Sequence, residues 1–492
     1  MQASVYPAAV ASAPEQDRGG HLGIALAAGL SFCAIVGLFA AGQAALLRVA
    51  IPASATVLAL VLYLQRPIVY VQFSLWMWFL TPFLRRVVDW RFGFADPNFI
   101  LLTPFLVAAI SGITLLRRDP QFPMRIPPTF IFCATAIFYG FVVGMVLHPS
   151  GETIYGLVNW LAPLLFGLHL CLRWQDYERV RDAIRRTFVV GILVMGIYGI
   201  YQYVVAPELD VYWLFNVQSP NALAPSFGLP EPFLLRIWST LNAPGPFADV
   251  MMVGLLLLLG TKSKLKLPAA LVGYFTLLLS AVRTAWLGWI VGVVLTLRRL
   301  KPVLLIRLAL SGALLGACLF FFMKVQPLKS QVTDRLQTMS SLETDSSYSD
   351  RAAMYRTLTA EALASPFGAG VSNSNEWKNF MIDSGILVIL LSFGWFGTIA
   401  FIVGIVLFLL QTRNQASSSD PLDEFQIACR AICIALLMQM IGGNVFTGVL
   451  GAMFWIFAGM IFASQVHSAH EPVFSEAVNP DDFAFAAAGR SR

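Results

Sequence analysis

Long, uninterrupted stretches of apolar residues recur along the chain from about residue 22 to residue 464. Most are long enough to cross about 30 Å of hydrocarbon as a helix. Their apolar positions are continuous rather than alternating, which indicates helices and not the strands of a barrel. The pattern predicts about fourteen membrane spans, near residues 22–42, 47–64, 67–84, 98–116, 128–147, 154–172, 187–205, 245–261, 267–282, 284–297, 303–323, 383–411, 427–444 and 448–464.

The composition supports this interpretation. Of the 492 residues, 58% are hydrophobic and only 12% are charged, whereas a soluble protein has about 25% charged residues. We therefore predict an all-α fold, a polytopic transmembrane bundle of about 12–14 helices over residues 21–464. Residues 1–20 and 465–492 are polar and are predicted to be disordered. The first apolar stretch has no obvious small-residue cleavage site after it, so we expect it to be retained as a helix.

Basic residues orient the predicted bundle. Four short loops that fall on one side are rich in arginine or lysine: 117–125, 173–186, 262–266 and 298–301. The positive-inside rule assigns that side, together with both termini, to the cytoplasm. The net charge of +6 is thereby explained by topology, and we expect no nucleic-acid partner. Two long loops, 206–243 and 325–380, then lie outside the cytoplasm, and loops of this length are usually functional or disordered.

Two features of the predicted topology remain open. Arg85, Arg86 and Arg91 fall in segment 85–97, which this topology places outside. Either the span count is wrong by one there, or these arginines meet an anion at the outer surface. The stretch 383–411 is also ambiguous. It contains Gly394 and forms either one kinked helix or two short segments.

Three further arginines lie in or beside the predicted outer loops. Arg236 precedes a span, Arg283 occupies a very short hairpin in the run Ser-Ala-Val-Arg-Thr-Ala-Trp-Leu, and Arg351 lies in the second long loop. A planar guanidinium suits bidentate binding of phosphate oxygens, so several on one face suit a pyrophosphate. Each could instead contact lipid headgroups. Arg283 is the hardest to explain in that way, because an ionisable residue so close to hydrocarbon is a functional candidate by default.

Asp383 is the candidate for acid–base chemistry. It stands where the second long loop enters a span, and partial desolvation there would suit a general base. Alternatively, it is the N-cap of that span. Neither long loop contains histidine, and the chain has no zinc-ligand spacing, phosphate loop or dinucleotide fingerprint. We therefore expect no metal and no cofactor, and a substrate that is already activated.

The order of motifs resembles that of the O-antigen ligase and polymerase family of bacterial membrane glycosyltransferases. The motifs are Arg236 with Ser-Thr-Leu-Asn-Ala-Pro-Gly-Pro-Phe-Ala, Arg283-Thr-Ala-Trp-Leu, Asp334-Arg335-Leu, Ser349-Asp350-Arg351 and Ser365-Pro-Phe-Gly-Ala-Gly370. The similarity covers roughly residues 150–465. It implies that the outer arginines Arg236, Arg283 and Arg351 hold the pyrophosphate of an undecaprenyl-linked glycan.

The sequence departs from the ligases of that family at one place. They typically have a His-Asn pair where the long loop re-enters the membrane, and this chain has Asp383-Ser384 there. This difference favours the polymerases of exopolysaccharide assembly. The run Leu-Arg85-Arg86-Val-Val-Asp is also similar to those polymerases, which adds Arg85 and Arg86 to the predicted pyrophosphate-binding residues.

The resemblance implies a metal-independent polymerase of undecaprenyl-pyrophosphate-linked repeat units at the outer face of the bacterial inner membrane. Asp383 and Arg283 are the expected catalytic residues. The expected partners are lipid-linked glycans, membrane lipids, and a chain-length regulator and flippase of the same pathway. Two alternatives remain: an O-antigen ligase that transfers the glycan to an acceptor, and a transporter without chemistry. A transporter typically shows internal repeats and broken helices at mid-membrane, and we find no convincing repeat.

Overall fold

The computed structural model describes residues 18–117, 126–217, 227–297, 358–371, 384–415 and 424–476, with Tyr355, Arg356 and a few isolated residues between 310 and 320. Helices make up all the regular structure in these residues. They are α1 (Arg18–Ala40), α2 (Ala44–Gln65), α3 (Pro67–Phe92), η1 (Phe99–Leu102), α4 (Thr103–Ala109), η2 (Ile110–Gly112), α5 (Ile113–Leu116), α6 (Pro128–Leu147), α7 (Gly151–Leu172), η3 (Trp174–Asp176), α8 (Tyr177–Val205), α9 (Glu208–Val217), α11 (Pro244–Leu259), α12 (Lys266–Leu279), α13 (Arg283–Leu297), α18 (Gly385–Gln415), α19 (Glu424–Met438), η6 (Gln439–Ile441) and α20 (Gly448–Glu476).

Ten of the described helical stretches are long and apolar enough to cross a membrane, and α11, α12 and α13 are shorter apolar helices. Together they correspond to thirteen of the predicted spans. The fourteenth, 303–323, lies outside the described residues apart from isolated positions. The prediction of an all-α, multi-pass membrane protein is confirmed.

Three predicted boundaries are wrong. Helix α3 continues to Phe92, so Arg85, Arg86 and Arg91 belong to its last turns and not to a loop. Helix α8 begins at Tyr177 and takes in most of the basic segment predicted as a loop. Helix α20 continues to Glu476, so the residues just after 464 are helical and not disordered. In each case a polar helical end extends beyond the apolar stretch that hydropathy detects.

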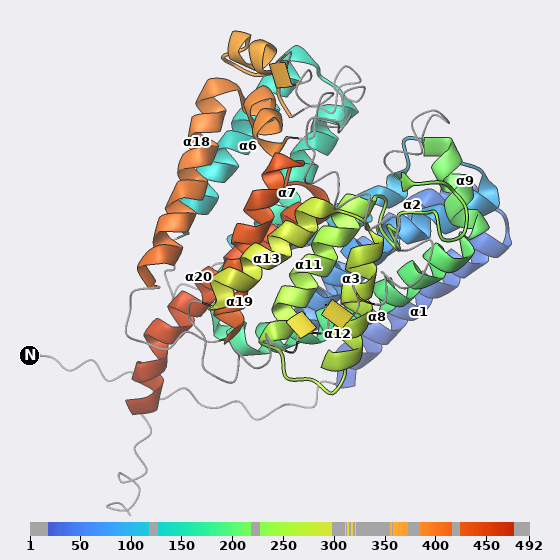
Figure 1. The fold of residues 1–492 in the computed structure, drawn as a ribbon, viewed down its shortest axis with the longest axis horizontal. Helices are drawn as coiled ribbons and strands as arrows, with labels where there is room; N and C mark the ends of the chain where they lie inside the picture. Colours follow the sequence, from blue (N-terminus) through green and yellow to red (C-terminus); the bar gives the residue numbers. More distant parts are fainter. Residues whose placement is uncertain are drawn as a thin grey trace, which may run out of the picture.

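The helices pack as neighbours that are often far apart in sequence (Figure 1). Helix α18 lies against α6, α20 lies against α7 and α19, and α8 lies against α3, α11 and α12. Helix α11 contacts α12, α13, α19, α8 and α20, and all but two of its residues are buried. A helix that is almost entirely apolar and buried on every side belongs in the centre of a bundle, and α11 occupies that place.

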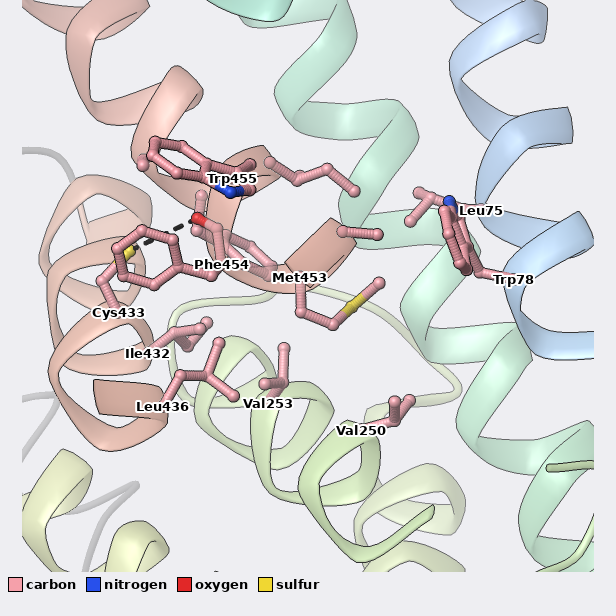
Figure 2. Packing of buried hydrophobic residues seen from close by; sticks show 14 of the residues in the cluster. Leu75, Trp78, Val250, Val253, Ile432, Cys433, Leu436, Met453, Phe454 and Trp455 are labelled. Carbon is pink, nitrogen blue, oxygen red and sulfur yellow. Dashed lines mark hydrogen bonds between the residues drawn. The ribbon is translucent and has the colours of Figure 1, made fainter. Parts of the chain in front are cut away.

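Aromatic and aliphatic residues fill the core around α11, α19 and α20 (Figure 2). Phe454 and Trp455 of α20 are fully buried, and their rings meet edge to face at 5.2 Å. Between α7 and α20, Gly167 and Gly459 lie so close to the opposite backbone that a Cβ atom at either would overlap it. Small residues of this kind allow the close helix approach on which packing in lipid depends.

Helix α18 covers most of the ambiguous stretch 383–411 and consists of two helical parts that join at a break at Gly394. Gly394 has φ 58° and ψ −162°, values outside the helical region. The backbone around the break pairs with the segment 365–371. Trp395 N donates to Pro366 O at 2.8 Å, and Ala369 N donates to Leu391 O at 2.8 Å. Backbone groups near the break therefore form hydrogen bonds with the non-helical segment 365–371, whose polar backbone would otherwise lack partners within the bundle.

We expect the substitution Gly167→Ala to destabilise the bundle, because the added methyl group would overlap the carbonyl of Trp455. Overpacking of this kind typically costs about 1–3 kcal/mol. The measurement is the midpoint of thermal unfolding in detergent. Gly37→Ala is the matched control, since Gly37 is also helical and has no atom within 4 Å of the new Cβ. An equal midpoint for the two variants would contradict the packing assigned to α7 and α20.

Candidate functional site

A buried ion pair joins α3 to α9. Arg86 Nε lies 2.8 Å from Asp210 Oδ1, and both side chains are fully buried. The other two guanidinium nitrogens of Arg86 donate to the backbone carbonyls of Ser239 and Leu241. The guanidinium also lies over the ring of Trp213, 5.8 Å from its centroid. Arg86 is therefore occupied by partners within the protein.

Asp210 extends this network to α8. Its Oδ2 atom accepts hydrogen bonds from the Tyr198 hydroxyl at 2.8 Å and from Gln202 Nε2 at 2.7 Å. The Oε1 atom of Gln202 in turn accepts from the backbone N–H groups of Trp238 and Ser239, at 3.0 and 2.8 Å. The chain between Trp238 and Leu241 is thus held from α3, α8 and α9 at once.

Arg85, the neighbour of Arg86, is held by a different carboxylate. Its Nε atom lies 3.1 Å from Asp89 Oδ2, one turn further along α3. Asp89 also pairs with Arg48 of α2 at 3.3 Å and accepts from Asn98 Nδ2 at 2.9 Å. This cluster fastens the end of α3 to α2 and to the chain that follows.

The network around Trp238 fixes the position of Arg236, two residues earlier. Arg236 Nε donates to Ser280 O and Nη2 donates to Ala281 O, both at 3.2 Å. These carbonyls lie at the end of α12, where the helix leaves its last C=O groups unpaired and carries partial negative charge. Arg283 begins α13 only two residues after Ala281. The structure therefore brings Arg236 and Arg283 to the same hairpin, and both side chains are partly exposed.

The segment Gln439–Asn444, between α19 and α20, connects this hairpin to the entry of α18. Gln439 Nε2 donates to Thr284 O, next to Arg283, at 2.9 Å. Gly385 lies so close to Gly443 and Asn444 that a Cβ atom at Gly385 would approach their backbone to within 2.5–3.2 Å. The start of α18 and the start of α13 thus contact one common segment.

The residue that caps α18 is Ser384. Its Oγ atom accepts a 3.4 Å hydrogen bond from Leu387 N, and the side chain is buried. An N-cap side chain accepts from the second or third helical N–H in this way, so the predicted alternative of an Asp383 cap is not needed. Asp383 itself lies outside the described residues, as does Arg351.

The predicted site residues thus fall into three groups. Arg236 and Arg283 come together at the α12–α13 hairpin. Arg85 and Arg86 lie buried at the end of α3 with carboxylate partners. Asp383 and Arg351 lie outside the described residues. Sequence reasoning missed Gln202, Asp210 and Gln439, although each is a polar residue in or beside an apolar stretch, which is the available signal.

These features define a class of protein, a polytopic helical membrane protein in which two arginines, one on the α12–α13 hairpin and one bonded to it, meet at one end of the bundle. Residues 268–402 match the family described as O-Antigen ligase. The predicted relation to the O-antigen ligase and polymerase family is confirmed by this domain, which includes Arg283, the segment 365–371 and the first part of α18. No curated protein matches the chain.

We expect the substitutions Arg86→Met and Asp210→Leu each to lower the midpoint of thermal unfolding strongly. Each leaves the other charge buried without its partner, which typically costs about 3–5 kcal/mol. The double variant removes both charges, so its loss should be smaller than the sum of the two single losses. Thermal unfolding in detergent measures all three. Strictly additive losses would show that the two side chains do not depend on each other.

Proposed function

We propose that this protein polymerises lipid-linked oligosaccharide repeat units. The O-antigen ligase family acts on glycans of the O-antigen type, so a lipid-linked glycan and the surrounding membrane lipids are the substrate and setting that the matched domain implies. The observation that supports a reaction most directly is the pairing of Arg236 and Arg283 at one hairpin. Two guanidinium groups at that place suit the two phosphates of a lipid diphosphate.

In the proposed reaction, a hydroxyl group on one repeat unit attacks the anomeric carbon of the sugar on another carrier. The bond from that carbon to the diphosphate breaks, and undecaprenyl diphosphate leaves. Arg236 and Arg283 stabilise the negative charge that develops on the leaving group. Donors placed for developing charge typically contribute about 3–4 kcal/mol each, and in this scheme the arginines supply the positive charge without a metal ion.

Asp383 accepts or orients the proton of the attacking hydroxyl in this proposal. Its neighbour Ser384 serves as the helix cap, so the proposal assigns the cap and the chemistry to different residues. Ser384 begins α18 beside the segment that bonds to Thr284. Arg351 is proposed as a further pyrophosphate ligand from the outer loop.

Arg85 and Arg86 have a different role in the proposal. Because their guanidinium groups are held by Asp89 and Asp210, we assign them to positioning. Arg86 fixes the chain that carries Arg236, and Arg85 fixes the end of α3. Neither is assigned direct contact with the diphosphate.

The polymerase assignment rests on Asp383-Ser384 where ligases have His-Asn. The matched family is described as a ligase, so transfer of the glycan to an acceptor is the second candidate function. We place the hairpin at the outer face of the bacterial inner membrane, with both termini in the cytoplasm, on the basis of the basic loops. A flippase and a chain-length regulator are the proposed pathway partners.

We expect Arg236→Ala, Arg283→Ala and Asp383→Asn each to lower polymer formation by about 100-fold or more, because each removes a group that acts in the transition state. The measurement is complementation of a strain that lacks the gene, with polymer length and lipid-linked intermediates scored at matched protein levels. Arg186→Ala is the matched control, since Arg186 is an exposed arginine on α8 that bonds to its own helix.

The intermediates distinguish the two candidate functions. Loss of a polymerase leaves single lipid-linked repeats, whereas loss of a ligase leaves finished chains that are not transferred. Full-length polymer from all three variants would refute the catalytic assignment.

A further inference from the structure

Helix α11 carries one charged residue in its otherwise apolar sequence, Asp249. The side chain is only 5% exposed. Its Oδ1 atom has no hydrogen-bond partner within the part of the chain that the structure describes. A buried carboxylate without a partner is unfavourable in the resting protein, and an ionisable group inside a membrane-spanning bundle is a functional candidate by default.

The packing of α11 against α13 shows where Asp249 lies. Met252 Sδ would be 2.6 Å from a Cβ atom at Gly288, and Leu256 Cδ1 would be 2.6 Å from one at Gly292. In both contacts the α13 residue lies the same number of positions after its α11 partner, so the two helices run in parallel at this contact. Residues three and seven apart share one helical face, so Asp249 lies on the same side of α11 as Met252 and Leu256, level with Ala285 of α13.

This level is close to the arginine hairpin. Ala285 follows Arg283 by two residues, which corresponds to about 3 Å along a helix axis. A polar side chain from a third element also lies against the contact between α11 and α13. Gln439 Nε2 contacts both Thr284 O at 2.9 Å and Met252 Sδ at 3.7 Å. Ala285 is fully buried, and Asp249 is the charged residue of α11 at this level.

The chemistry of the two charges is complementary. Arginines bind the diphosphate, which offers hydrogen-bond acceptors. An unpartnered carboxylate oxygen needs a donor, and in a lipid-linked glycan the donors are sugar hydroxyl groups. The attacking hydroxyl must approach within about 3–3.5 Å of the anomeric carbon, which is one oxygen away from the diphosphate. A carboxylate at the depth of the arginine hairpin is therefore at the depth where that hydroxyl loses its proton.

We propose that Asp249 is the proton acceptor of the glycosyl transfer, an inference that rests on the proposed function. The hydroxyl O–H bond breaks and its proton passes to Asp249. The hydroxyl oxygen bonds to the anomeric carbon, and the bond from that carbon to the diphosphate breaks, with its electron pair remaining on the phosphate oxygen. The proton then leaves Asp249 for the released diphosphate. Of the two roles that the proposed function gives Asp383, accepting or orienting the proton, Asp383 then keeps the orienting role.

The test uses the full chain in lipid nanodiscs, with lipid-linked repeat units extracted from a strain that lacks the gene. Two quantities are measured, the rate of polymer formation and the affinity for the extracted substrate. We expect Asp249→Asn to lower the rate about 100-fold or more, the typical contribution of a general base, and to leave affinity within about 3-fold. Asp249→Glu, which keeps the carboxylate, should restore part of the rate. Met252→Leu is the control for a change at the same contact between α11 and α13 and should keep both values.

Thermal unfolding of each variant separates chemistry from folding. Asp249→Asn should unfold at or above the wild-type midpoint, because it removes a buried charge, and Asp249→Glu provides a second variant if the amide does not fold. Polymer formation by Asp249→Asn within about 3-fold of wild type would overturn the proposal, as would a loss explained by affinity alone. If the wild-type protein binds the substrate but forms no polymer, the proposed function itself is wrong.

Discussion

The buried pair of Arg86 and Asp210 is the contact on which the geometry of the site depends. A guanidinium and a carboxylate removed from water must satisfy every remaining donor and acceptor within the protein. Arg86 does so with the carbonyls of Ser239 and Leu241, and Asp210 does so with Tyr198 and Gln202. Because those partners lie on separate elements, satisfying the pair also fixes the chain that leads from Arg236 into α11.

This dependence explains how arginines at this end of the bundle serve two different purposes. Arg85 and Arg86 have carboxylate partners and are buried, and they stabilise the arrangement. Arg236 donates to backbone carbonyls at the end of α12, where the partial negative charge of the helix end helps to hold the guanidinium at the hairpin.

The sequence was sufficient for the spans, because hydropathy is a local property. It also identified Gly394 as the place where 383–411 kinks or divides, and it placed Arg236 and Arg283 on one face of the bundle. It did not show that both meet the α12–α13 hairpin, because Arg236 reaches that hairpin across more than 40 residues of chain. It was insufficient for the end of α3. Arg85 and Arg86 look like loop residues by hydropathy, yet they are helical because Asp89 and Asp210 compensate their charges. Asp210 is more than 120 residues from Arg86, and no local pattern identifies such a partner. The same limit applies to Gln439, whose role depends on contact with Thr284.

The depth of the site follows from the proposed substrate. An isoprenoid tail remains in hydrocarbon and a glycan remains in water, so the diphosphate between them must lie at the boundary. Arginines can occupy that boundary at modest cost, because their long side chains reach toward water. A short aspartate side chain cannot, so Asp249 on α11 stays in a poorly hydrated environment. There a proton acceptor does not compete with bulk water for the attacking hydroxyl. A position just below the arginines, on the hydrocarbon side, is therefore the favourable place for the carboxylate.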